Sequence, residues 1–354
     1  MAGHVFLAGL AAETAVLRSV LGDYAANPAE VAGIALVQAA EGPWPVVVVA
    51  GGGRVSGVIL SLSAAQHERL DFALRALGMT PVNLALGVTY LGQGAGAILG
   101  TAADVLAVVL AYLDDILPLQ GQMAAETLAR RLSPALVRAA SRFRAQEAAA
   151  PTTLRRATAA GDIVTHARRL PYAQFFAVEE YDLSWRRFDG AHSPNTTRAA
   201  FVSGDAVTVL PYDPKRDLVL VVEQIRAGPF ARGDRQSWQI EAIAGRVDPF
   251  ETPEQAARRE AVEEAGLTLT ELIPVAQYYP SPGAKTEFLY SYVALTHLPD
   301  GCAGVFGLAE EAEDIRGHLI SFDRLMALVA SGEIANAPLI LTALWLQRER
   351  ARLR

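Results

Sequence analysis

Residues 252–266 carry the start and stop signals of one short helix, and this helix constrains the fold of the chain more than its other segments do. Thr252 and Gln255 form a capping-box pair, in which each side chain can bond the backbone N–H of the other residue. Pro253 suits the first helical position, and Gly266 suits the left-handed residue that ends a helix. The apolar positions in between are small, namely Ala256, Ala257, Ala261 and Val262. We therefore expect a helix whose apolar face packs closely against a neighbouring layer.

The same helix carries several carboxylates on one face. Glu260, Glu263 and Glu264 stand at positions i, i+3 and i+4, where like charges repel one another by roughly a few tenths of a kcal/mol per pair. A bound cation would relieve this repulsion. Carboxylate oxygens suit Mg²⁺ or Mn²⁺, and Mg²⁺ commonly joins a few carboxylates to substrate phosphates. The pattern predicts a divalent-metal site for a diphosphate, and the alternative is a solvated acidic helix with Arg259 as an ordinary ion-pair partner.

The segment around this helix resembles a complete Nudix box. The matching positions are Gly245, Glu251, Arg259, Glu260, Glu263, Glu264 and Gly266. The resemblance implies an α/β fold, in which helices cover both faces of a mixed sheet, and a Mg²⁺-dependent hydrolase of nucleoside diphosphates.

Three later segments resemble the ADP-ribose pyrophosphatase subfamily, so that the likeness extends over about residues 168–350. They are the Ser-Pro-Gly loop at 278–283, the acidic loop at 307–316 and the closing helices around 332–347. A solvated acidic loop is the other interpretation of residues 310–313.

The resemblance assigns roles to individual residues. It implies metal binding by the main-chain carbonyl of Ala244 and by Glu260, Glu264 and Glu313. It makes Glu311 the general base for the attacking water, Glu263 a ligand or a supporting acid, and Arg259 the residue that holds these carboxylates. It implies substrate contacts by Phe175, which would stack on adenine, and by Arg198, Arg226, Ser281, Gly283 and Glu287. Phe175 precedes Phe176 and could instead be a packing residue.

Composition limits the classes of protein to which the chain can belong. The net charge of −7 argues against general nucleic-acid binding, and the single cysteine, Cys302, excludes an internal disulfide. The most apolar window, 84–113, contains Gln93 and Asp104, which argues against a membrane span. The first residues lack the pattern of a secretory signal. We expect a cytoplasmic protein.

The chain is long enough for two domains, and we expect three parts. Residues 1–118 predict a small α+β domain with a strand at 45–49 and a turn at 51–53, and they weakly resemble the γ-glutamylcyclotransferase-like β-barrel family without its chemistry. Residues 119–167 predict a helical linker whose arginines form a solvated face. An anion-attracting or nucleic-acid-binding surface is the alternative for these arginines.

Residues 168–354 predict the Nudix domain. They include a hairpin around Asp213-Pro214, a strand at 288–294 and helix from Ser321 to the end.

The sequence therefore predicts hydrolysis of ADP-ribose to AMP and ribose 5-phosphate by metal-activated water. One alternative is another nucleotide sugar such as GDP-mannose, because the box and the acidic loop would serve either. Another is a sensor that binds ADP-ribose without turnover, although no box carboxylate has been lost. The resemblance also implies a homodimer in which Phe175 and Arg198 act across the subunit interface.

Overall fold

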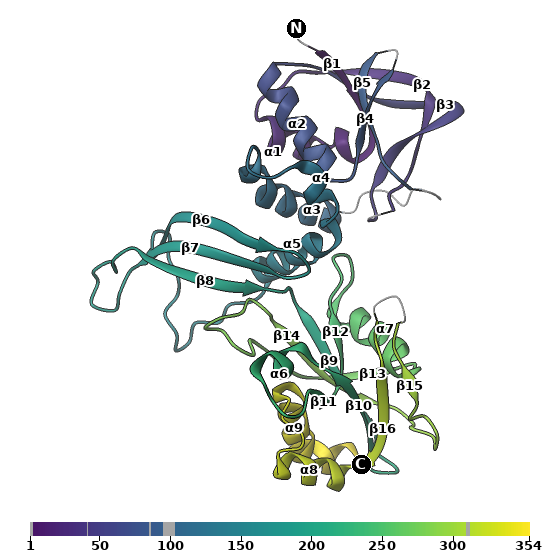
Figure 1. Cartoon of the computed structure of the whole chain (residues 1–354), viewed down its shortest axis with the longest axis vertical. Coiled ribbons are helices and arrows are strands. Elements are labelled where there is room, and N and C mark those ends of the chain that lie inside the picture. Colours follow the sequence, from purple (N-terminus) through teal and green to yellow (C-terminus); the bar gives the residue numbers. More distant parts are fainter. Residues whose placement is uncertain (1–2, 41, 85, 95–102, 309–311) are drawn as a thin grey trace. The chain divides into compact units, whose positions relative to one another are not determined.

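The computed structural model describes residues 3–40, 42–84, 86–94, 103–308 and 312–354. The chain divides into two compact units (Figure 1). The first comprises Met1–Asp162 with Tyr172–Phe176, and the second comprises Ile163–Pro171 with Ala177–Arg354. No helix among the described residues combines the length and the apolar character that a bilayer crossing requires.

The first unit combines a five-stranded sheet with several helices. Its strands are β1 (Gly3–Leu7), β2 (Ala26–Gln38), β3 (Pro45–Leu62), β4 (Thr80–Leu84) and β5 (Gly87–Leu91). Its helices are α1 (Thr14–Leu21), α2 (Ala64–Ala76), α3 (Ala103–Ile116), α4 (Ala125–Ala129) and α5 (Leu132–Glu147). The strand order is β2-β3-β1-β5-β4, with an additional pairing of β3 and β5. Helices and strands were both expected here, but no barrel is detected among the described strands.

Strand β3 corrects the predicted turn at 51–53. The strand continues through the glycines, and its register against β2 shifts between Ala32 and Ile34, which pair with Arg54 and Val49. The additional residues of β3 form an irregularity opposite Gly33 rather than a chain reversal. A Cβ on Gly53 would lie 2.4 Å from the carbonyl oxygen of Ile34, so the close approach of the two strands requires glycine there.

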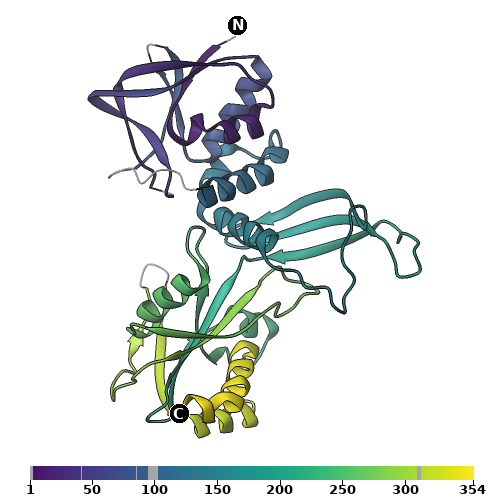
Figure 2. The same ribbon diagram turned by 180° about the vertical axis from the view of Figure 1, so that it is seen from behind.

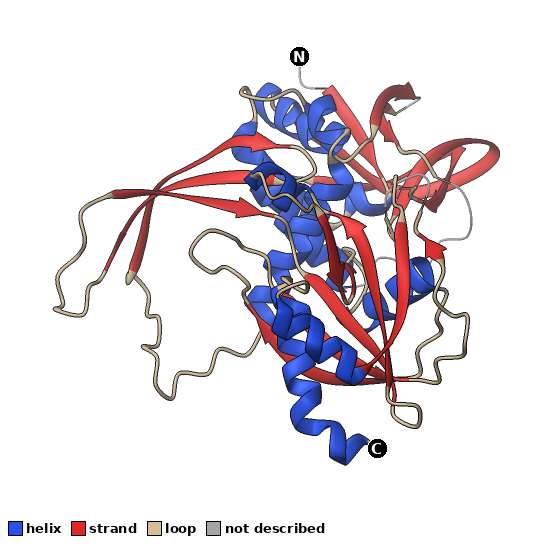
Figure 3. Ribbon diagram, turned by 60° about the horizontal axis from the view of Figure 1, so that its bottom comes forward, coloured by secondary structure: helices blue, strands red, loops and turns tan. Residues whose placement is uncertain are grey.

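The second unit contains two sheets (Figure 3). Strands β6 (Ile163–Ala173), β7 (Ala177–Trp185) and β8 (Thr196–Val202) form the smaller one. The larger, eight-stranded sheet contains β9 (Ala206–Asp213), β10 (Leu218–Ile225), β11 (Trp238–Glu241), β12 (Ile243–Arg246), β13 (Glu271–Tyr278), β14 (Leu289–Leu295), β15 (Val305–Phe306) and β16 (Ile315–Ser321). The helices are α6 (Ala227–Arg232), α7 (Pro253–Ala265), α8 (Phe322–Ser331) and α9 (Ala337–Leu353).

The larger sheet is mixed, because β14 runs parallel to β9 whereas the other neighbouring strands are antiparallel. Strands β9 and β10 form the predicted hairpin, but they pair only near the turn, at Asp213–Leu218 and Tyr212–Val219. Further along, β12 pairs with β9 and β11 pairs with β10. The sheet therefore forks where β11 and β12 begin to replace the direct pairing of β9 and β10. At this fork the box helix α7 packs on β9 and β12, and Gln224 of β10 contacts Glu264 of the helix.

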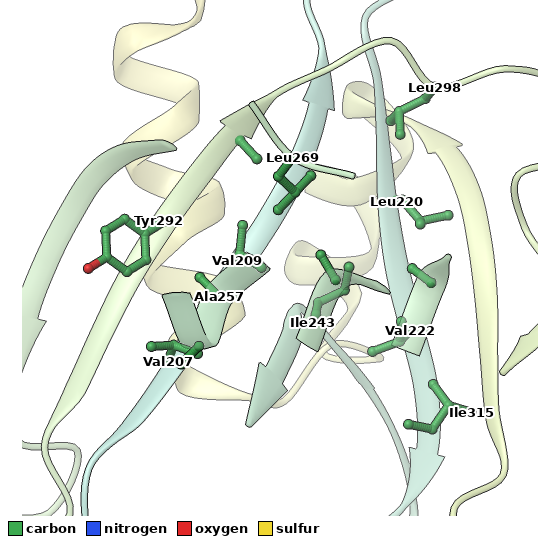
Figure 4. Packing of buried hydrophobic residues seen from close by; sticks show 14 of the residues in the cluster. Val207, Val209, Leu220, Val222, Ile243, Ala257, Leu269, Tyr292, Leu298 and Ile315 are labelled. Atoms are coloured by element: carbon green, nitrogen blue, oxygen red, sulfur yellow. The ribbon is translucent and has the colours of Figure 1, made fainter. Parts of the chain in front are cut away.

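Two apolar clusters cover opposite faces of this sheet, and the period-2 alternation of the strands separates them. Val207, Val209, Leu220 and Val222 pack with the alanines of α7 (Figure 4). Leu210, Tyr212, Val219 and Val221 pack with α8 and α9. In Figure 2, α7 lies on one side of the sheet, and α8 and α9 lie on the other. The predicted α/β class with a mixed sheet is confirmed.

The two helical faces differ in the size of their side chains. Ala256, Ala257 and Ala261 of α7 are fully buried, so small side chains bring this helix close to the strands, as predicted. The prediction for Val262 was wrong, because Val262 is 54% exposed and Ala265 is the buried residue at the end of this face. On the other face, complete burial of an aromatic such as Phe322 contributes about 1.5–3 kcal/mol. The predicted helix from Ser321 is in fact two helices, since Gly332 ends α8 in a left-handed conformation and Asn336 caps α9.

Candidate active site

Arg259 lies in the middle of α7 and connects three carboxylates. Its Nη1 donates to Glu260 Oε1 at 2.8 Å and to Glu263 Oε2 at 3.0 Å. Its Nε and Nη2 donate to the two oxygens of Glu251 at 3.2 and 2.6 Å, a bidentate contact, and Nη2 also donates to the carbonyl of Arg246 at 3.0 Å. Burial lowers the pKa of Arg259, but these carboxylates more than offset that effect, so the pKa lies above its ordinary value. Arg259 therefore stays positively charged, and its hydrogen bonds hold the carboxylates of Glu251, Glu260 and Glu263 in position.

Glu260 and Glu264 are buried, with exposed fractions of 9% and 2%. Burial raises the pKa of Glu260 to about 7, although Arg259 acts against this, and burial raises the pKa of Glu264 to about 8. Gly245 makes room for Glu260, because a Cβ at this glycine would lie 1.8 Å from Glu260 Oε1. The fold thus holds two carboxylates in a place where their negative charge is unfavourable without a cation.

Glu264 is held from two strands of the fork. The backbone N–H of Ala244, on β12, donates to Glu264 Oε2 at 3.0 Å. The buried amide of Gln224, on β10, makes a long contact of 3.5 Å with Glu264 Oε1. Each oxygen of this carboxylate therefore has a partner on a different strand.

Glu313 and Arg226 bring further charge to the same place. Glu313 Oε2 accepts from the backbone N–H of Leu308 at 3.2 Å, and its charge contributes to the raised pKa of both Glu260 and Glu264. Burial lowers the pKa of Arg226, but the charges of Glu241, Glu264 and Glu313 raise it above its ordinary value. The structure therefore gathers predicted metal ligands and one predicted phosphate-binding arginine at the fork.

The donors at the fork fit a divalent cation. They are hard carboxylate oxygens, and their burial and mutual repulsion would be relieved by positive charge. Within the described ranges, no group of three or more His, Cys, Asp or Glu side chains is arranged to hold a metal ion by itself. Mg²⁺ usually binds through one or two carboxylates and completes its shell with water and substrate phosphates.

The predicted substrate loop is attached to β8. The N–H of Phe201 donates to the carbonyl of Ala284 at 2.8 Å, and the N–H of Thr286 donates to the carbonyl of Phe201 at 3.0 Å. Ser281 and Gly283 lie on this loop and are exposed. Glu287 pairs with Lys285 at 3.7 Å, so an ion pair already engages the carboxylate that was expected to bind ribose.

Two other predicted substrate residues have aromatic neighbours. Arg198, on β8, lies over the ring of Trp185, 5.6 Å from its centroid, and its Nη1 donates to the carbonyl of Thr197. Phe175 is 62% exposed and packs edge-to-face on Phe176, in the segment that clusters with the first unit. The large exposed fraction of Phe175 argues against the alternative interpretation of this residue as part of a packed core.

The predicted general base, Glu311, lies outside the described residues, as does Glu310. The roles of all these side chains therefore stay predictions.

Sequence reasoning missed three polar residues at or beside the fork. Gln224 and Glu241 are buried on strands, and Asn336 caps α9. The signal for Asn336 was present, since Asn before Ala-Pro marks a helix start. Gln224 and Glu241 gave a weaker signal, because each is a polar side chain near the end of a strand, and such a side chain needs a partner when it is buried.

Comparisons with known proteins agree with the geometry of the second unit. A family model described as the NUDIX domain matches residues 202–340. The chain is 37% identical over 186 residues to an ADP-ribose pyrophosphatase of Escherichia coli strain K12, covering 52% of this chain and 88% of that protein. It is 34% identical to an ADP-ribose pyrophosphatase of Haemophilus influenzae, covering 51% of this chain and 84% of the relative. A GDP-mannose pyrophosphatase of Salmonella paratyphi B is 33% identical, with coverages of 42% and 77%. None of these matches supports the resemblance that was expected for residues 1–118.

Proposed function

The chain belongs to the NUDIX family, and we propose that this Nudix hydrolase cleaves ADP-ribose to AMP and ribose 5-phosphate. The observation that carries the proposal is the buried pair Glu260 and Glu264, held against the backbone of Ala244 and Gly245 within range of the charge of Arg226. The two relatives named ADP-ribose pyrophosphatases support this choice of substrate.

Each side chain has a different proposed role in the reaction. A divalent cation held by Glu260 and Glu264, and another held by Glu313, would neutralise charge on the diphosphate and lower the pKa of the attacking water. Arg226, whose Nε and Nη2 are engaged by Glu241, would direct Nη1 to a phosphate oxygen. Glu311 would accept the proton of the water as its oxygen bonds to a phosphorus and the bridging P–O bond breaks.

GDP-mannose is the second candidate substrate, and the Salmonella relative supports it. The carboxylates of the fork would serve either substrate, because both contain a diphosphate. The nucleobase distinguishes the two substrates, since adenine and guanine present different hydrogen-bonding edges.

A substrate panel tests the proposal. Purified protein with Mg²⁺ is incubated with ADP-ribose, GDP-mannose or NADH, and kcat/KM is determined from the products. The proposal predicts the highest kcat/KM for ADP-ribose. A preference for GDP-mannose would support the second candidate, and binding of ADP-ribose without turnover would make the protein a sensor.

The proposal includes a homodimer in which Phe175 and Arg198 act on the partner's substrate. Sedimentation equilibrium measures the assembly, and a monomer at the concentration of the assay would contradict this part. Mixing Glu264→Gln with Arg198→Ala then tests the shared site, because a mixed dimer would restore one complete site.

A further inference from the structure

Glu241 is a buried carboxylate that connects the fork to the carboxy-terminal helices. It lies at the end of β11 and is 6% exposed. Its Oε2 accepts from Arg226 Nε at 2.9 Å and lies 2.7 Å from Arg226 Nη2. Its Oε1 accepts from Asn336 Nδ2 at 2.9 Å. Both oxygens therefore have partners, as the burial of a carboxylate requires.

The orientation of Asn336 is fixed by the helix that it caps. Its Oδ1 accepts from the backbone N–H of Leu339 at 3.1 Å, in the first turn of α9. Because that N–H must meet an oxygen, the amide nitrogen has to point the other way, toward Glu241. The start of α9 thus determines where the hydrogen-bond donor for Glu241 lies.

Arg226 needs such a support. It directly follows β10 and occupies the cap position before α6, where its backbone is extended. An arginine side chain has many rotamers to lose on binding a ligand, and a carboxylate that already holds the guanidinium reduces that loss. Its guanidinium contacts Glu241 through Nε and Nη2, and the side chain as a whole is 41% exposed.

We propose that Glu241 and Asn336 are positioning residues, through which the cap of α9 holds the Arg226 guanidinium toward the substrate diphosphate. This inference rests on the proposed function for its substrate. A merely structural ion pair is the competing explanation, and it predicts that each substitution acts independently of Arg226.

A double-mutant cycle separates the two explanations. Asn336→Ser retains an oxygen that can cap α9 but loses the amide donor. We expect kcat/KM to fall about 100-fold in Arg226→Ala and about 10-fold in Asn336→Ser, by analogy with losses of charge-stabilising and supporting groups. The double variant should match Arg226→Ala within about twofold, because residues that act through one another are non-additive. Multiplicative losses would overturn the proposal.

Ser321→Ala is the matched control for a weakened helix cap. Ser321 Oγ accepts from the N–H of Arg324 at the start of α8, and its substitution should lower the melting temperature without reducing kcat/KM. A loss of activity in this control equal to that of Asn336→Ser would also overturn the proposal.

A second readout does not depend on turnover. In protein with ¹⁵N-labelled arginine, Nε–H exchange of Arg226 should be slow in the wild type and at least about fivefold faster in Asn336→Ser and Glu241→Gln, because hydrogen-bonded donors exchange slowly. Unchanged exchange in both variants would overturn the proposal. Faster exchange in both variants of a protein that hydrolyses no nucleotide sugar would support the hold of Glu241 and Asn336 on Arg226 and would contradict the proposed function instead.

Discussion

The two units differ in what they bury. Among the described residues, the second unit buries Glu179, Asp205, Asp213, Glu241, Glu260 and Glu264, whereas the buried polar residues of the first unit are Thr89 and Asp162. Burying a carboxylate costs several kcal/mol unless partners compensate for lost water. Such an arrangement lowers stability, and clusters of buried carboxylates with raised pKa values are typical of functional sites, so the comparison favours the second unit as the place of the proposed reaction.

Not every buried carboxylate of the second unit belongs to the fork. Burial opposes ionisation of Asp213, but its pKa is lowered overall by the N–H groups of Leu298, Arg216 and Lys215 and by His297. This carboxylate is satisfied and has a structural role in the β9–β10 turn. Glu260 and Glu264 have raised pKa values instead, because the partners around them do not offset their burial as fully as those of Asp213 do.

The largest expected effect is that of Glu264→Gln. Loss of the charged oxygens should lower kcat by at least roughly 10³-fold, at the upper end of the range for removal of one charge-stabilising group. The fold should persist, since a neutral amide is easier to bury than a carboxylate. Turnover and thermal melting are measured together. Glu254→Gln is the control on the same helix, because Glu254 accepts from Tyr292 Oη at 3.3 Å and is not one of the predicted metal ligands. An equal loss of kcat in Glu254→Gln would contradict a special role for Glu264.

Gly245→Ala should have the next largest effect. The new Cβ would displace Glu260, from whose Oε1 it would lie 1.8 Å away. We expect kcat/KM to fall about 10–100-fold, as when a ligand's supporting contacts are changed. Gly228→Ala is the control, since nothing lies within 4 Å of its added Cβ. Wild-type activity in Gly245→Ala would mean that the position of Glu260 is unimportant.

The stability of the second unit should depend on pH through Glu260 and Glu264, which have no buried glutamate as a counterpart among the described residues of the first unit. The folded, metal-free protein binds more protons than the unfolded chain between the ordinary pKa of 4.5 and the raised values of about 7 and about 8 for Glu260 and Glu264. These groups therefore reduce the stability of the second unit as pH rises through that window. Mg²⁺ should raise the melting temperature more at pH 8 than at pH 5.5. Equal shifts in calorimetry at the two pH values would argue against metal binding by these carboxylates.

The smallest effect is expected in the first unit. Thr89 is fully buried, and its hydroxyl donates to the carbonyl of Phe6 at 2.5 Å. Thr89→Val should destabilise this unit by about 1 kcal/mol, the usual net value of one hydrogen bond. Turnover should stay within twofold of the wild type. Denaturant melts combined with an activity assay check this, and a large loss of activity in a folded variant would assign the first unit a role in the chemistry.

The box helix was predictable because its signals are local. Thr252, Pro253, Gln255 and Gly266 act within a few residues of one another, and the structure reproduces the capping box and the left-handed end. The grouping of Glu260 and Glu264 followed from helical spacing alone. Local rules of this kind need no knowledge of the rest of the chain.

The remaining features depend on contacts between distant residues. Asn336 and Glu241 meet across 95 residues, and Gln224 and Glu264 meet across 40, so no local pattern identifies them as partners. The glycines of β3 fit a turn or a strand irregularity equally well, and only the pairing with β2 decides between them.

Release of AMP from ADP-ribose by the wild-type chain, followed with Mg²⁺ and with EDTA, tests the central claim most directly. The account predicts stoichiometric AMP and ribose 5-phosphate with Mg²⁺ and none with EDTA. Equal release under both conditions, or no release with Mg²⁺ from a folded protein, would contradict it.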